Sequence, residues 1–390
     1  MPVAVSTPVT TTGIPHQDVA SLKASKPQDV RRLVNLLRKP RTQDQVQLIS
    51  AHRGLRWGGI AENGKESIRR AALASIPSVE IDIRCTSDGV VVCLHDDGIG
   101  RVTNIAEHLG RDDVYSPLTA EGYNPLASSV PWHGVMERLR LKNERGELTD
   151  ERVLRLADLL DMIRDEKLTM VVFMDMYKRL KVAHGRKQKQ ATAAAYEVIK
   201  SRSDAMGIPA LEWCIWKADT VFHRLPADLE QEAWFQDGVS QGLPPLYIPV
   251  IDAPTSLEDQ LLPLVSAKQW ASRSYVVSLE IGLRSPHGPL SDVVHWARQT
   301  GHSMGFFAAL GDVPNDPAPV EDRMVFHEGH PPMKYDELLR PGTSNDGHDH
   351  RGDLALFKRL GFSWVIGEAT DPALGTEDMF RGQREAVTRR

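Results

Sequence analysis

Short apolar runs alternate with helix-like stretches along most of this 390-residue chain. Eight such runs occur, at residues 47–52, 79–83, 170–174, 213–216, 246–251, 275–281, 304–310 and 363–366. Helical periodicity lies between most of them, at residues 66–75, 153–164, 191–202, 257–266, 290–299 and 353–360. Eight strands that alternate with helices predict an α/β fold, a (β/α)8 TIM barrel. An open, doubly wound sheet is the alternative, although no nucleotide-binding glycine motif follows a strand.

Tails flank this repeat, and two long connections interrupt it. We expect residues 1–45 to be an N-terminal tail with a short amphipathic helix, residues 46–375 to be the barrel, and residues 376–390 to be a C-terminal tail. The insertion 98–150 and the long loop 312–352 show little periodicity, and connections of that length are commonly lids or binding loops. Both are predicted on the catalytic face, together with an extra apolar run at 90–94.

Bulk properties exclude several classes of protein. The net charge of −5 and the sequence pI of about 6.3 favour no nucleic-acid partner. The chain has no run of 18 or more apolar residues and no secretory leader pattern, so we expect no transmembrane segment and a cytoplasmic location. Cys85, Cys93 and Cys214 lack the spacing of a disulfide framework or a zinc site. Nothing in the sequence indicates the oligomeric state.

Two carboxylates, Glu80 and Asp82, stand two residues apart in the second run. Because side chains of a strand alternate between its faces, both point to the same side. Carboxylates that face each other inside a barrel are costly unless a cation neutralises them, and oxygen ligands suit Mg²⁺ or Ca²⁺. Asp175, which follows the third run, is placed to supply a third carboxylate. We therefore expect one divalent cation; a solvated polar strand face is the alternative for the pair.

Two histidines and an arginine end neighbouring runs. His52 closes the first run and precedes Arg53, and His95 closes another apolar run. Imidazoles exchange protons near neutral pH, and a guanidinium matches phosphate oxygens. Beside a cation, these groups are the parts that phosphodiester cleavage needs, with one histidine taking a proton and the other giving one. Lys217 ends the fourth run and is a candidate for phosphate contact, and Glu280 is a candidate for the barrel interior.

Five linked motifs lie in the first half of the predicted barrel. In order they are His52-Arg53-Gly54, Glu62-Asn63, Glu80-Ile81-Asp82, a DGxxVxxHD match from Asp88 to Asp96, and Arg101-Val102-Thr103. Thr370-Asp371-Pro372 follows the eighth run. This order and spacing resemble the glycerophosphodiester phosphodiesterase family, part of the PLC-like phosphodiesterase superfamily of TIM barrels. The resemblance spans about residues 47–375 and is most specific in its N-terminal half.

The resemblance implies a metal-dependent hydrolase of small-molecule phosphodiesters, either glycerophosphodiesters or lysophospholipids. It also implies roles for individual residues. By this resemblance His52 and His95 are the acid–base pair, and Glu80, Asp82 and Asp175 bind the metal. Arg53 binds phosphate. Glu62 supports the site from behind these groups, and Asn63 shapes the loop.

Two positions depart from the family pattern. The family has Glu-x-Lys on its third strand, where this chain has Asp175 and Tyr177, with Lys178 one step later on the opposite face. The phosphate-contacting lysine is therefore missing, displaced, or replaced by Lys217. Aspartate at this place is similar to the spider-venom sphingomyelinase D enzymes, which share the barrel and the two histidines. Residues 306–309 read FFAA where the family has WTxN.

Three functions fit these observations. The first is hydrolysis of the phosphodiester. The second is a sphingomyelinase D-like lyase or transferase reaction that gives a cyclic phosphate, and the identity of the product separates it from the first. The third is a non-catalytic barrel that binds a phosphorylated ligand. The sequence does not indicate which diester is the substrate, or whether Mg²⁺ or Ca²⁺ is preferred.

Overall fold

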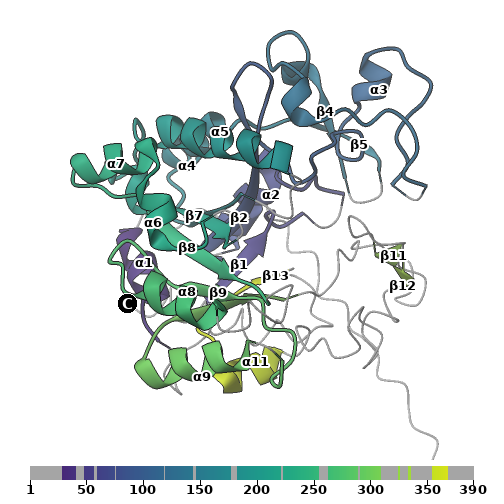
Figure 1. Cartoon of the computed structure of the whole chain (residues 1–390). Helices are drawn as coiled ribbons and strands as arrows, with labels where there is room; N and C mark the ends of the chain where they lie inside the picture. The colour runs from purple at the N-terminus through teal and green to yellow at the C-terminus, as the bar shows by residue number, and fades with distance from the viewer. Residues whose placement is uncertain are drawn as a thin grey trace, which may run out of the picture.

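Eight parallel strands form a closed barrel in the computed structural model (Figure 1). The structure describes residues 29–40, 48–56, 59–74, 76–117, 119–143, 146–176, 182–220, 223–253, 262–288, 290–308, 324–325, 333–334 and 354–367. Around the ring the order is β1 (Leu48–His52), β13 (Trp364–Gly367), β10 (Met304–Phe307), β9 (Leu279–Ile281), β8 (Leu246–Ile251), β7 (Cys214–Asp219), β6 (Val171–Asp175) and β2 (Ser78–Cys85). Parallel pairing of β1 with β2 closes the ring, which confirms the predicted barrel and excludes an open sheet.

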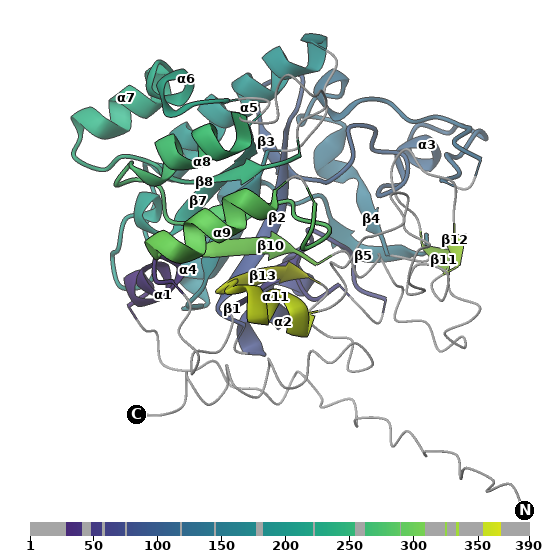
Figure 2. The same ribbon diagram turned by 60° about the horizontal axis from the view of Figure 1, so that its bottom comes forward.

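Helices surround the barrel (Figure 2). They are α2 (Lys65–Leu73), α4 (Leu156–Asp165), α5 (Val182–Ile199), α6 (Pro226–Glu230), α7 (Ala233–Ser240), α8 (Leu262–Ala271), α9 (Ser291–Thr300) and α11 (Leu354–Leu360). Each of the six helical stretches predicted from periodicity overlaps one of these helices. The largest shift at a C-terminus is in α8, which continues past the predicted end at residue 266 because Ala267 and Trp270 extend its buried face.

The short helix α1 (Arg31–Leu37) packs at the amino ends of the strands. Arg38, which follows it, donates hydrogen bonds to the carbonyl oxygens of Ser274 and Val276, just before β9. The hydroxyl of Ser303, just before β10, donates to the carbonyl oxygen of Leu37. The predicted helix near residues 29–39 therefore exists, and it covers the end of the barrel away from the predicted site.

The insertion 98–150 forms a small packed unit, called here the insertion module, beside the barrel (Figure 1). It contains α3 (Ile105–His108), the 3-10 turns η2 (Ala127–Ser129) and η3 (Met136–Arg138), and an antiparallel pair of strands, β4 (Arg140–Lys142) and β5 (Leu148–Arg152). The module has its own apolar cluster, which includes Ile99, Val102, Ile105, Trp132, Met136, Leu139 and Leu141. Its core rests on β3 (Val91–Cys93), the extra run, which pairs antiparallel to β2 outside the barrel.

Several predicted features lie outside the described residues. These are most of the N-terminal tail, the whole C-terminal tail, Tyr177, Lys178 and the segment Thr370-Asp371-Pro372. Most of the loop 312–352 also lies outside, and from it the structure describes only the antiparallel pair β11 (Met324–Val325) and β12 (Met333–Lys334). A third 3-10 turn, η4 (Ala210–Glu212), precedes β7. Within the described part of the chain, no helix is both long enough and apolar enough to cross a membrane.

Aromatic side chains fill the barrel below the polar site. Trp364 of β13 and Phe173 of β6 are buried, and their ring centroids lie 5.2 Å apart. The indole occupies the space beside Gly305, where an added Cβ atom would approach Trp364 to 1.9 Å. Because Phe173 and Asp175 are two residues apart on β6, they share the inward face. The polar side chains therefore begin where the aromatic layer ends, at the carboxyl ends of the strands.

Candidate functional site

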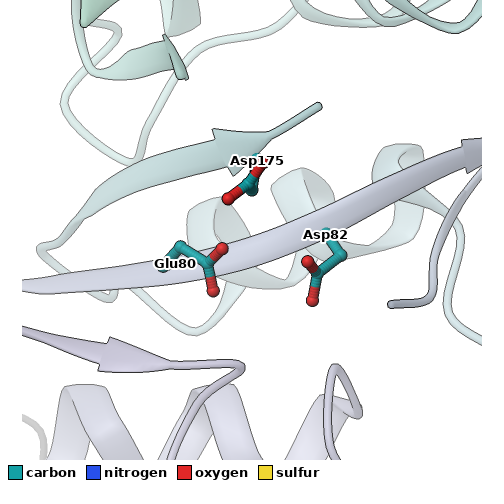
Figure 3. Close-up of side chains that lie close together, drawn as sticks. All are labelled: Glu80, Asp82 and Asp175. Carbon is teal, nitrogen blue, oxygen red and sulfur yellow. The ribbon is translucent and has the colours of Figure 1, made fainter. Parts of the chain in front are cut away.

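Three carboxylates from two neighbouring strands meet inside the barrel (Figure 3). Glu80 and Asp82 lie on β2, and Asp175 ends β6 directly beside Asp82 in the strand register. Each residue offers an oxygen atom, and these atoms all lie within 4.8 Å of one another. Glu80 and Asp82 are each 1% exposed, so their repulsion is poorly screened by water. The trio is a set of hard oxygen donors of the kind that Mg²⁺ and Ca²⁺ select.

The pKa values of Glu80 and Asp82 are shifted in opposite directions. Burial, followed by the charge of Asp82, raises the pKa of Glu80 well above its ordinary value. Burial also acts to raise the pKa of Asp82, but the charges of His95 and Arg53 outweigh it and the net effect is a lowered pKa. Asp82 is held in place by Asn63, which donates from its side-chain amide at 2.9 Å and accepts the Asp82 amide N–H at 3.1 Å.

Both predicted histidines lie close enough to Asp82 to lower its pKa. His52 ends β1 beside Glu80 in the register, and its ring meets the Phe307 ring edge-on, with centroids 4.9 Å apart. His95 follows β3, and its Nδ1 lies 2.6 Å from an oxygen of Asp96. The structure thus brings the two imidazoles to the carboxylate trio from different elements.

Glu62 is the centre of an arginine cluster. Arg53 and Arg56 each donate to one of its oxygens, at 3.1 and 3.2 Å, and Arg101 donates to the other at 2.6 Å. Arg101 also donates to Asp96 at 2.5 Å, so this cluster extends to the partner of His95. Glu62 is only 7% exposed, so these charged contacts are largely removed from water.

Arg53 is buried beside the carboxylate trio. Its side chain is 5% exposed and its Nε lies 3.3 Å from Asp82, while its backbone N–H donates to Glu80 at 3.3 Å. The turn that places it depends on Gly54, which has a φ of +82°. A Cβ atom at Gly54 would approach the Ser67 backbone to 2.7 Å, which explains why glycine follows Arg53.

Lys217 of β7 reaches the same interior. Its Nζ lies 2.8 Å from Asp175, 3.3 Å from Glu280 and 4.0 Å from Glu80. Burial acts to lower the pKa of Lys217, but these carboxylates outweigh it and raise the pKa. Lys217 is thus at the carboxylates, where it could replace the family's strand-three lysine, and Lys178 lies outside the described residues.

The sequence prediction missed four residues of this network. Asn63 was expected only to shape a loop, and no role was predicted for Arg56, Asp96 or Arg101. The signal was present for three of them, because Asn63, Asp96 and Arg101 all belong to the linked motifs. Arg56 belongs to none, and its burial at 2% exposure is visible only in the fold.

Comparisons with known proteins agree with this architecture. Residues 52–221 match the model of the glycerophosphoryl diester phosphodiesterase family. Glycerophosphodiester phosphodiesterase 1 of Mus musculus is 34% identical over 154 residues and that of Rattus norvegicus is 43% identical over 154 residues. Each match covers 39% of this chain and 39% of the curated relative's length.

Two solved structures share the fold. A glycerophosphoryl diester phosphodiesterase from Parabacteroides distasonis aligns over 91% of this chain and 93% of its own, with a TM-score of 0.51 and 17% identity. A protein from Silicibacter pomeroyi described as a glycerophosphoryl diester phosphodiesterase aligns over 90% of this chain and 97% of its own, with a TM-score of 0.53 and 13% identity. At these identities the likeness establishes the barrel alone.

Proposed function

We propose, from the match of residues 52–221 to the glycerophosphoryl diester phosphodiesterase family, that this chain is a metal-dependent phosphoric diester hydrolase. Its proposed substrates are small molecules, either glycerophosphodiesters or lysophospholipids. The observation that carries the proposal is the meeting of three carboxylates and two histidines at the carboxyl ends of the strands. Barrel enzymes hold their active sites at this end.

We assign Glu80, Asp82 and Asp175 as ligands of one divalent cation, Mg²⁺ or Ca²⁺. Their oxygens gather within 4.8 Å, and two of the three side chains are buried, so a cation would relieve a repulsion that the fold imposes. When bound, the cation would polarise a phosphoryl oxygen and offset developing negative charge.

His52 and His95 are the proposed acid–base pair. One takes the proton from the attacking oxygen and the other protonates the leaving oxygen. The Asp96 carboxylate beside Nδ1 of His95 favours a proton on that nitrogen, which leaves Nε2 to exchange a proton with the reactants. Asp96 therefore fixes both the orientation of the ring and the nitrogen that reacts.

Arg53 and Lys217 are the proposed phosphate-binding groups. Both are buried next to the carboxylate trio, and both carry positive charge that would oppose the charge of a phosphodiester. Glu62 supports Arg53, since it accepts a hydrogen bond from the guanidinium at 3.1 Å. These charges would favour a transition state in which negative charge spreads over the phosphoryl oxygens.

A lyase or transferase that releases a cyclic phosphate is the second candidate. The residue type at position 175 favours it. Asp175 completes the trio at a place where the hydrolase family has glutamate. The two reactions share the acid–base pair and differ in the nucleophile, which is water in one and a substrate hydroxyl in the other. The choice between them therefore depends on the product.

We also propose a cytoplasmic location. Cys85, Cys93 and Cys214 are all free thiols, and Cys93 and Cys214 are buried as small apolar side chains. Free thiols are typical of a reducing compartment.

Phosphorus NMR with glycerophosphocholine and with lysophosphatidylcholine tests the reaction. Each substrate is incubated with the protein and Mg²⁺, with Ca²⁺, or with a chelator. A phosphomonoester that forms only with a cation is the expected product. A cyclic phosphate would favour the second candidate, and no conversion of either substrate would contradict both.

Replacement of Glu80 and Asp82 by alanine tests the metal assignment. We expect the double variant to lose both turnover and the rise in melting temperature that Mg²⁺ or Ca²⁺ gives the wild type, because two of the three ligands are gone. Circular dichroism checks that the variant is folded, because the change also removes buried partners of Arg53 and Lys217. Retained turnover would mean that these residues are wrongly assigned.

A further inference from the structure

Lys217 faces carboxylates from three other strands. Its Nζ lies near Asp175 of β6 and Glu80 of β2, at 2.8 and 4.0 Å, and near Glu280 of β9, at 3.3 Å. Asp175 and Glu80 belong to the carboxylate trio, whereas Glu280 does not. Lys217 therefore stands between the proposed cation site and a further acid.

The strand register explains how Glu280 reaches this place. Lys217 pairs with Ile248 of β8, and Glu280 pairs with Val250, two residues further along the same strand. Two residues correspond to one step on the inward face of a strand. Glu280 thus lies one inward step nearer the carboxyl end of the barrel than Lys217. In ring order it lies on the opposite side of Lys217 from β2 and β6.

Charge makes the position of Glu280 significant. Glu280 and Lys217 are each 4% exposed, and a buried carboxylate is costly without a cationic partner. A divalent cation held by the trio would repel the Lys217 ammonium and compete with it for Asp175. The lysine stem is flexible, so the ammonium can turn towards another acceptor. Glu280 is an acceptor that the cation does not need.

We propose that Glu280 is a positioning residue for Lys217. It holds the ammonium on the β9 side when a divalent cation occupies Glu80, Asp82 and Asp175, so that lysine and cation act on the same phosphate without competing for Asp175. The inference rests on the proposed function. It adds to that function a residue that is neither a metal ligand nor an acid–base group.

Metal binding, measured without substrate, tests this role. Isothermal titration calorimetry with Mg²⁺ and with Ca²⁺ compares the wild type, Glu280→Gln, Lys217→Met and the double variant. We expect Glu280→Gln to weaken binding about tenfold when Lys217 is present and by no more than about twofold in the Lys217→Met background. The reason is that Lys217 without Glu280 stays on Asp175, whereas methionine cannot compete there.

Two comparisons separate positioning from other effects. A general effect of lost negative charge would weaken binding equally in both backgrounds, so the difference between backgrounds measures the coupling. Glu230→Gln is the matched control, because Glu230 of α6 pairs with Arg273, which follows α8, and its loss should leave cation affinity unchanged. The double variant removes both members of the buried pair, and its cation affinity is compared with that of Lys217→Met.

The outcomes distinguish this inference from the proposed function. Equal affinity of the wild type and Glu280→Gln, or an equal loss in both backgrounds, overturns the role of Glu280 and leaves a metal-dependent hydrolase in place. Coupling between the two residues in a protein that converts no phosphodiester supports the inference and contradicts the proposed reaction. A wild type that binds neither cation overturns the metal assignment and the inference together.

Discussion

At the scale of single residues, Asp96 joins the acid–base pair to the arginine cluster. One of its oxygens lies 2.6 Å from Nδ1 of His95, and the other accepts a hydrogen bond from Arg101. Burial acts to raise the pKa of Asp96, but Arg101 and His95 outweigh it and hold that pKa well below its ordinary value. The carboxylate is therefore charged at neutral pH and fixes the ring beside it.

We expect Asp96→Asn to lower kcat at least about 10- to 100-fold, the loss seen when a carboxylate that orients a metal-bound histidine is changed. The amide still fills the space but no longer favours a proton on Nδ1 of His95. Steady-state kinetics measures the effect, and Asp165→Asn, on the exposed end of α4, is the matched control. A kcat equal to that of the wild type would show that His95 works without Asp96.

Glu62 gives a dependence of stability on pH. Burial acts to raise its pKa, but Arg101, Arg53 and Arg56 outweigh it and lower the pKa below the ordinary value of 4.5. A carboxyl with a lowered folded-state pKa contributes stability that is present above its unfolded-state pKa and is lost as the pH falls below it. We expect Glu62→Gln to lower the melting temperature at pH 7. The difference in melting temperature between the wild type and the variant should narrow from about pH 5 to about pH 3. Melting curves at several pH values measure this, and a constant gap would contradict it.

The residues that the sequence predicted best are those on strands. Glu80 and Asp82 were expected to share a face because they are two positions apart, and their oxygens do meet Asp175. Asn63 was predicted only to shape a loop, yet it is fully buried and binds Asp82. Its φ of 53° puts its side chain in the site through a left-handed turn, and such a turn leaves no periodic signal in a sequence.

At the scale of elements, the turn after β1 sets the positions of His52 and Arg53. Gly54→Ala introduces a Cβ atom 2.7 Å from the Ser67 backbone at a φ of +82°. We expect it to lower the free energy of unfolding by more than the roughly 1–2 kcal/mol that a left-handed alanine costs. Gly134→Ala, at a φ of +81° with nothing within 4 Å, carries the conformational cost alone and is the control. Urea denaturation measures both, and equal losses would mean that the turn relaxes around Ser67.

Strand and helix periodicity predicted the barrel well and the insertion module poorly. All eight barrel strands lie where apolar runs were found, because strands buried on both faces are continuously apolar. Inside the module, α3 has four residues and β4 has three, too short for either period to appear. The module's fold depends on contacts between distant segments, such as the bridge between Thr103 and Leu141, which no local pattern encodes.

At the scale of the whole molecule, the insertion module has its own core, and hydrogen bonds and ion pairs connect it to the barrel. Asp88, in the turn before β3, accepts the backbone N–H groups of Trp132 and His133 at 2.8 and 3.1 Å. Arg101 of the module donates hydrogen bonds to Glu62 and to Asp96, which is the partner of His95. The order of the module is thereby connected to the geometry of the candidate site.

Trp132→Ala tests this connection, because Trp132 is 7% exposed in the core of the module. Loss of a large core aromatic typically costs about 3–5 kcal/mol. We expect faster hydrogen exchange across residues 98–150, little change in the barrel strands, and lower turnover because Arg101 is no longer held. Hydrogen-exchange mass spectrometry and kinetics measure these effects.

Trp296→Ala, on α9 against the main core, is the control and should speed hydrogen exchange in α9 instead. Faster exchange throughout the barrel in Trp132→Ala would mean that the module and the barrel unfold as one cooperative body.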